Sequence, residues 1–183
     1  MERIGVEHVE RRLKVEAEHK AQLFGQGLIF FNLENWYSAP WIIESVLRVT
    51  GLYGRARRNA DQVEIRRNAL EFVNLPPTFE SFTILHLSDL HVDISEGAIR
   101  KLIGIVSDLR YDICVLTGDY RGKTYGPFDK SLKGIDELRA QLKGPLYGVL
   151  GNHDSILMTP SLEAMGIRML FNESIHHFEI SDF

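Results

Sequence analysis

Three short, nearly all-apolar runs in the second half of the chain most constrain what it can fold into. They cover residues 83–87, 112–116 and 146–150, and the amphipathic stretches Glu96–Leu109 and Leu132–Leu142 separate them. Runs of this length suit strands buried on both faces, and strands that alternate with helices build a parallel sheet. We therefore predict an α/β layer whose parallel strands are joined by helical crossovers.

The first 75 residues have a different pattern, in which apolar residues recur at helical spacing, and they are predicted to form a helical extension. A first helix is expected to end at Gly25, a second to begin after Ser38 and end at Gly51, and a third to cover Asp61 to Leu70. The apolar face of the first helix is predicted from its spacing of three or four residues: Val9, Leu13, Ala17, Ala21 and Phe24.

The proline pair Pro76-Pro77 cannot continue a helix, and it marks a boundary between the helical extension and the α/β part of the chain. We place the helical extension at residues 1–76 and the α/β domain at 77–183. The tail from Arg168 to Ile180 is predicted to add two more short strands.

Composition narrows the class of protein. The 183 residues are 44% hydrophobic and 25% charged, as in globular proteins, and the formal net charge of −4 argues against binding polyanions by bulk charge. No apolar run approaches the roughly 20 residues that span a bilayer. The acidic start is unlike a secretory signal, and the single cysteine, Cys114, fits a reducing compartment. A cytoplasmic location is expected, with peripheral membrane contact left open.

Each apolar run ends in residues of types that bind metals. Asp89 and His91 follow the first run, Asp119 follows the second, and Asn152 and His153 follow the third. Because ligands of parallel α/β sheets bind at the carboxyl ends of the strands, we expect these side chains to converge. The mixed oxygen and nitrogen set suits Mn, Fe or Zn better than Ca or Mg.

Three motifs at these strand ends carry a resemblance to a known family: Asp89-Leu90-His91, Gly118-Asp119 and Gly151-Asn152-His153-Asp154. They resemble the first three blocks, D-x-H, G-D-x-x-D and G-N-H-D/E, of the calcineurin-like metallophosphoesterases. The local sequence around them is similar to that of the bacterial branch of the family. The resemblance covers about residues 80–183 and implies an α/β/β/α sandwich with a helical N-terminal extension. Because the chain ends at Phe183, about where the second half of that fold would begin, we expect a truncated domain without its C-terminal half.

The resemblance implies a role for each candidate metal ligand. Asp89 and His91 would bind a first divalent ion, Asp119 would bridge two ions, and Asn152 would bind the second. Two ions at such a site activate water and clamp the reacting oxygens of a phosphate ester.

Two further residues are implied to be catalytic. His153 would protonate the leaving oxygen of the ester and Asp154 would orient His153. The implied activity is that of a metal-dependent hydrolase, a phosphatase or phosphodiesterase that uses Mn, Fe or Zn and takes a phosphate-ester substrate.

The chain departs from the family pattern in two places. Gly122 stands where the second block has an acid, and the later histidine and the G-H-x-H block are missing, since no glycine precedes His176 and His177. Arg121 is expected to be a solvated loop charge, with contact to substrate phosphate as the alternative. The alternative function is a catalytically impaired fragment that acts as a membrane-surface or protein-interaction module.

The segment from Trp36 to Arg67 begins with the aromatic residues Trp36, Tyr37 and Trp41 and holds six arginines. Three explanations stay open: a membrane-surface patch, a nucleic-acid partner, and a helical arm with a solvated basic face. We favour the helical arm, and nucleic acid is the weakest of the three because of the net negative charge. His86 is expected to be a core or supporting histidine rather than a metal ligand, since alternation points it away from the site.

Overall fold

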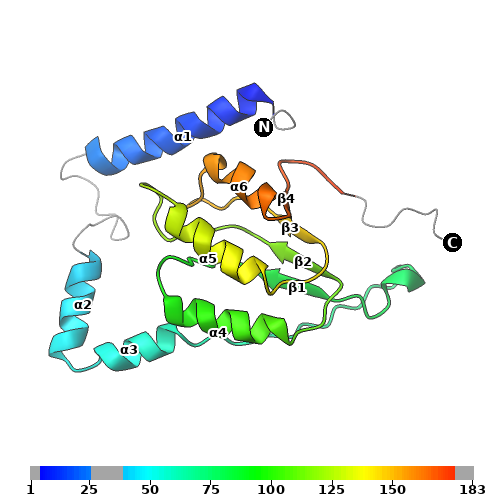
Figure 1. Ribbon diagram of the computed structural model, residues 1–183, viewed down its shortest axis with the longest axis horizontal. Coiled ribbons are helices and arrows are strands. Elements are labelled where there is room, and N and C mark those ends of the chain that lie inside the picture. Colours follow the sequence, from blue (N-terminus) through cyan, green and yellow to red (C-terminus); the bar gives the residue numbers. More distant parts are fainter. Residues whose placement is uncertain (1–4, 26–38, 176–183) are drawn as a thin grey trace.

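The computed structural model describes residues 5–25 and 39–175, and its second half is a parallel sheet. Four strands lie in the order β1-β2-β3-β4: Ile84–Leu87, Ile113–Leu116, Leu146–Gly148 and Ile167–Met169 (Figure 1). Helix α4 (Glu96–Ser107) joins β1 to β2, and α5 (Asp129–Arg139) joins β2 to β3. The 3₁₀ helix η4 (Ile156–Met158) and α6 (Thr159–Ala164) join β3 to β4. The predicted α/β layer with helical crossovers is therefore confirmed.

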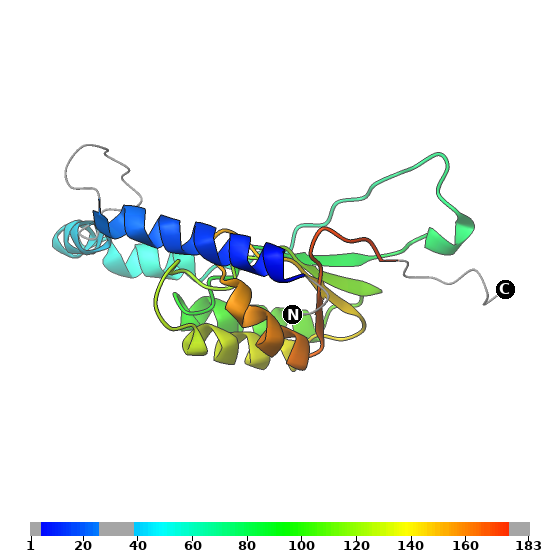
Figure 2. The same cartoon turned by 90° about the horizontal axis from the view of Figure 1, so that it is seen from above.

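One face of the sheet forms the core of the protein. Figure 2 shows α4, α5 and α6 together on the same side of the strands. Alternate strand residues point to that side, so Cys114 and Leu116 of β2 and Leu146 of β3 are buried against these helices. Burial also raises the pKa of the Cys114 thiol to about 12, which keeps the side chain a neutral core residue.

The opposite face of the sheet is left open by the described part of the chain. Ile84 is 55% exposed and Val149 is 36% exposed, and His86 and Arg168 are also exposed. The prediction that the strands are buried on both faces is therefore wrong for the described residues. His86 is likewise not a core residue, and its Nε2 lies 2.8 Å from Thr117 Oγ1.

The first two predicted helices are confirmed as α1 (Val6–Gly25) and α2 (Ala39–Val49). Gly51 follows α2 with a φ of 71°, the left-handed conformation that ends many helices. Ser38, the predicted N-cap, lies outside the described residues. On α1, Val9 and Leu13 are half-buried as expected but Ala17 is exposed, and the side chains of Ala21 and Phe24 are outside the description.

The third predicted helix is wrong in position. The structure has a helix at Tyr53–Ala60 (α3), and the chain then crosses to β1 without regular structure except for the 3₁₀ turn Pro77–Phe79. Of the apolar residues in the predicted segment, Val63 packs against the core, but Ile65 and Leu70 are 50% and 75% exposed. A short helix needs an apolar face packed on the protein, and this segment has none.

The tail was predicted to hold two strands around Asn172-Glu173. The first is β4, which begins one residue before the predicted Arg168. The second falls partly on residues 176–183, outside the described chain, as do His176 and His177. In the part of the chain that is described, no helix combines the length and apolar character needed to cross a bilayer.

Truncation of a core leucine tests the assigned core. Leu162 of α6 is fully buried, whereas Leu157 of η4 is 50% exposed. We expect Leu162→Ala to lower the free energy of unfolding by about 2–5 kcal/mol, because it leaves a cavity. Leu157→Ala is the control and is expected to cost less than about 1 kcal/mol in the same urea titration. Equal losses in the two variants would contradict the assigned core.

Candidate metal centre

The parallel register of β1 and β2 brings their carboxyl ends together. Leu87 pairs with Leu116 at the last position of the ladder. Beyond it the two chains stay adjacent, because the Asp89 N–H donates to the Gly118 carbonyl at 3.2 Å and the His91 N–H donates to the Asp119 carbonyl at 2.9 Å. The two predicted metal-binding loops are thus held side by side by their own backbones.

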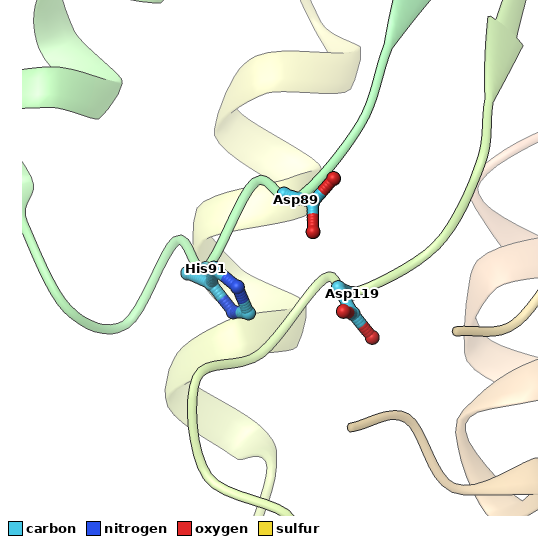
Figure 3. A group of neighbouring side chains, drawn as sticks. All are labelled: Asp89, His91 and Asp119. Carbon is cyan, nitrogen blue, oxygen red and sulfur yellow. The ribbon is translucent and has the colours of Figure 1, made fainter. Parts of the chain in front are cut away.

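Three predicted ligands converge at this point. Asp89, His91 and Asp119 each offer a ligand atom, and these atoms all lie within 4.8 Å of one another. Figure 3 shows Asp89 and His91 on the chain that leaves β1 and Asp119 on the chain that leaves β2. Two carboxylates this close repel each other, and a divalent cation would offset that repulsion. The donor set of two oxygens and one imidazole is of a kind that binds a divalent metal ion, and the choice of Mn, Fe or Zn stays a prediction.

The backbone at these three residues is strained. Asp89, His91 and Asp119 have φ values of 53°, 39° and 53°, a region that residues with a Cβ rarely adopt. Such conformations cost on the order of 1–3 kcal/mol each and persist where the surrounding structure fixes them, which is typical of functional sites. Strain at all three converging ligands therefore marks this edge of the sheet as a built site.

Two glycines allow the loops to approach closely. A Cβ on Gly118 would collide with the backbone of Gly151, and a Cβ on Gly151 would collide with the carboxylate and backbone nitrogen of Asp119. Gly118 also has a φ of 92°. These two glycines therefore let the loops pack closely, and Gly118 also serves a turn that needs a positive φ.

Hydrogen bonds fix the tautomers of the two site histidines. His91 Nδ1 donates to the Arg121 carbonyl at 2.8 Å, and His153 Nδ1 donates to the Gly122 carbonyl at 2.9 Å. A carbonyl oxygen only accepts, so each Nδ1 carries a proton and each Nε2 is left for a ligand or a proton. The two rings meet edge to face, with centroids 5.1 Å apart. His153 therefore stands beside the cluster of converging ligands.

Asn152 and His153 lie on the loop that follows β3. The His153 N–H donates to Asp119 Oδ1 at 3.0 Å, which ties this loop to the second predicted ligand loop. Asn152 itself is exposed. The assigned roles of Asn152 as a metal ligand and His153 as an acid stay predictions.

Asp154 is buried and joins two loops. Its Oδ1 accepts from the Tyr120 N–H at 2.9 Å and the Arg121 N–H at 3.4 Å, and its Oδ2 accepts from the Gly151 N–H at 2.9 Å. Burial raises the pKa of Asp154, and these backbone donors act in the opposite direction. Asp154 therefore joins its own loop to the loop after β2, and the Gly122 carbonyl holds the His153 ring. That Asp154 orients His153 stays a prediction.

Arg121 is not the solvated loop charge that the sequence suggested. It is 5% exposed, and its guanidinium donates to three loop carbonyls, those of His153, Thr124 and Gly126, at 2.6, 2.9 and 3.2 Å. A single arginine thus replaces the regular hydrogen bonds that this irregular loop lacks. Lys123, a charged residue of the same loop, is exposed.

Asp93 is a supporting residue that the sequence reasoning missed. Its Oδ1 accepts from the Gly122 N–H at 2.7 Å, at the position where the family pattern has an acid on the second loop. A Cβ on Gly122 would collide with Ile94. Asp93 thus joins the loop after β1 to the loop after β2 at Gly122, and its place two residues after His91 was the available signal.

Substitution of Gly118 tests whether close approach builds the centre. Gly126 has a similar φ of 85°, but a Cβ there would meet nothing within 4 Å, so Gly126→Ala carries the backbone penalty alone. We expect Gly118→Ala to lower the free energy of unfolding by about 1–3 kcal/mol more than Gly126→Ala does, because of the collision. Thermal unfolding together with Mn²⁺ titration measures both effects, and Mn²⁺ affinity should fall only in Gly118→Ala. Indistinguishable variants would show that the approach is not required.

Comparison with known proteins agrees with this geometry. A family model described as "Calcineurin-like phosphoesterase" matches residues 82–182, more than half of the chain. The "Uncharacterized metallophosphoesterase YkoQ" of Bacillus subtilis (strain 168) is 30% identical over 105 residues, which cover 56% of this chain and 38% of the relative. No solved structure matches.

A second relative is the "Transmembrane protein with metallophosphoesterase domain" of Bos taurus. It is 26% identical over 144 residues, which cover 73% of this chain and 30% of the relative. The chain therefore spans well under half the length of both curated relatives. The family match contains all three converging loops, and the chain belongs to the calcineurin-like phosphoesterase family.

Proposed function

We propose that this site hydrolyses a phosphoric ester with the help of two divalent metal ions, Mn, Fe or Zn. The observation that carries the proposal is the convergence of Asp89, His91 and Asp119, with ligand atoms within 4.8 Å of one another on strained backbone. Family membership supports the same reaction class. Because the chain spans 38% and 30% of its relatives, the activity of the whole protein is part of the proposal.

In this proposal each side chain of the site has a distinct task. Asp89 and His91 would hold one ion, Asp119 would be a ligand of both, and Asn152 would hold the second. The ions supply a nucleophile from water and neutralise charge on the phosphoryl group. The loops that carry these side chains are already hydrogen-bonded to one another, so metal binding requires little reorganisation of the loops.

The leaving group needs a proton, and His153 is the proposed donor. Its ring stands 5.1 Å from the His91 ring, and the Gly122 carbonyl holds its Nδ1, which leaves Nε2 for the leaving oxygen. Asp154 serves as a positioning residue that fixes the loop beneath His153. The bond between Arg121 and the His153 carbonyl adds to this support.

Substitution of the bridging carboxylate tests the hydrolase proposal. We expect Asp119→Asn to reduce turnover of p-nitrophenyl phosphate or bis-p-nitrophenyl phosphate by more than about 100-fold, because a direct ligand should cost more than the 10- to 100-fold of a supporting residue. Asp136→Asn, an exposed aspartate of α5, is the matched control and should keep parental rates with Mn²⁺ or Zn²⁺. Equal rates in the parent and Asp119→Asn would rule out this site as the source of hydrolysis.

A second candidate function is contact with an anionic membrane surface, and α2 favours it. Four apolar side chains form one exposed stripe on this helix: Ile42, Ile43, Val46 and Val49. Exposed arginines follow on α3: Arg55, Arg57 and Arg58. Figure 1 shows α2 at the periphery, away from the sheet. An apolar stripe beside cationic side chains fits the interface of an anionic bilayer, and one relative is named as a transmembrane protein.

Vesicle binding tests this second candidate. We expect co-sedimentation with phosphatidylserine-containing vesicles that weakens at raised salt, because the arginine contribution is screened. Ile43→Ser should weaken binding by about 10- to 100-fold, since the variant loses about 1.5–3 kcal/mol from burial of the isoleucine side chain. Leu157→Ser, an exposed leucine on another part of the molecule, is the control. If no salt-sensitive binding occurs, α2 is not a membrane contact. The expected cytoplasmic location would then stand without membrane contact through this helix.

A further inference from the structure

The first helix reaches the loop that carries Asn152 and His153. Helix α1 precedes the family match by more than fifty residues, yet it contacts η4 and the loop before it. Two charged residues on its inner face, Arg12 and Glu16, are partly buried, with 36% and 23% of their side-chain surface exposed. The inner face of α1 is therefore built around an ion pair as well as around the apolar residues Val9 and Leu13.

Arg12 binds the loop through its backbone carbonyls. Its Nη2 donates to the Gly151 carbonyl at 2.7 Å and to the Asp154 carbonyl at 3.3 Å, while its Nε donates to Glu16 Oε1 at 3.1 Å. The two carbonyls flank Asn152 and His153 on either side. The planar guanidinium can serve all three acceptors at once, which an ammonium group cannot do with the same geometry.

Glu16 binds the far end of the same loop. Its Oε2 accepts from Ser155 Oγ at 2.7 Å, and its Oε1 accepts from the Ile156 N–H at 3.0 Å. Ser155 and Ile156 are 6% and 2% exposed, so water does not replace this carboxylate easily. Together the ion pair provides two donor contacts and two acceptor contacts to a segment of six residues.

The other partners of this loop come from the sheet side. Asp119 accepts from the His153 N–H and Arg121 donates to the His153 carbonyl, whereas the Gly151 N–H is bonded within the loop, to Asp154. The carbonyls of Gly151 and Asp154 face α1 instead, and both accept hydrogen bonds from Arg12. The loop is thus held from both sides, and one of these sides lies outside the matched family domain.

We infer that Arg12 and Glu16 are positioning residues that fix the loop of residues 151–156 and so set the place of Asn152 and His153. The consequence for metal binding rests on the proposed function. We call the contacts of Arg12 and Glu16 with residues 151–156 the clamp. Loss of the clamp should leave binding of the first ion, for which Asp89 and His91 are the proposed ligands, unchanged. It weakens the second ion, for which Asn152 is the proposed ligand. A purely structural helix would affect both ions equally or neither.

The experiment uses the full chain with Mn²⁺ alone as the probe. Arg12→Ala removes the clamp, and Arg11→Ala removes the same charge from the exposed face of the same helix as a matched control. Hydrogen exchange of the peptide covering residues 151–156 reports the loop directly. Mn²⁺ titration followed by electron paramagnetic resonance separates the first ion from the spin-coupled pair.

We expect faster exchange across 151–156 in Arg12→Ala and an affinity for the second Mn²⁺ about 10- to 100-fold weaker, with the first Mn²⁺ unchanged. Arg11→Ala should match the parent in both measurements. Glu16→Gln keeps one acceptor oxygen, so its effect should be intermediate, and it serves as the test if Arg12→Ala does not fold.

Two results would overturn the inference: identical exchange in Arg12→Ala and Arg11→Ala, or equal weakening of both Mn²⁺ ions. Failure of the proposed function is recognised separately, because the parent chain would then bind no Mn²⁺. In that case hydrogen exchange still decides whether the ion pair holds the loop.

Discussion

The buried carboxylate of Asp154 is the contact on which the arrangement of the site depends. It accepts backbone N–H groups from Tyr120 and Arg121 on one loop and from Gly151 on another, so two strand ends are locked together by one side chain. A buried charge of this kind is tolerated because several donors satisfy it. Removing those donors would leave an unpaired carboxylate, and the loops could not separate without that cost.

Close packing of loops has a second effect, which is backbone strain at the candidate ligands. Asp89, His91 and Asp119 take positive φ values, and beside Asp119 the glycines Gly118 and Gly151 let two loops approach within contact distance. The strain is stable because the parallel ladder beneath is regular and its core face is buried under α4, α5 and α6. Strained backbone at this edge of the sheet, where acidic and imidazole groups are presented, thus lowers the stability of the fold.

Helix α1 extends the site beyond the sheet domain. Its ion pair holds backbone groups of the third loop, which the sheet side leaves facing outward. The exposed stripe of α2 is different in kind, since it is an apolar surface rather than a set of polar contacts. The N-terminal region therefore combines a helix that supports the site with one that faces outward.

The sequence by itself determined the parallel sheet and the convergence of Asp89, His91 and Asp119, because short apolar runs and the residues at their ends depend on local pattern alone. It misplaced the third helix, took Arg121 for a solvated charge, and missed Asp93, Arg12 and Glu16. Each of these depends on which distant backbone group lies nearby: Arg121 serves carbonyls of two loops, and Arg12 meets Gly151 139 positions along the chain. Only the tertiary structure brings such groups together, since a spacing in the sequence carries no record of an unpaired carbonyl in another loop.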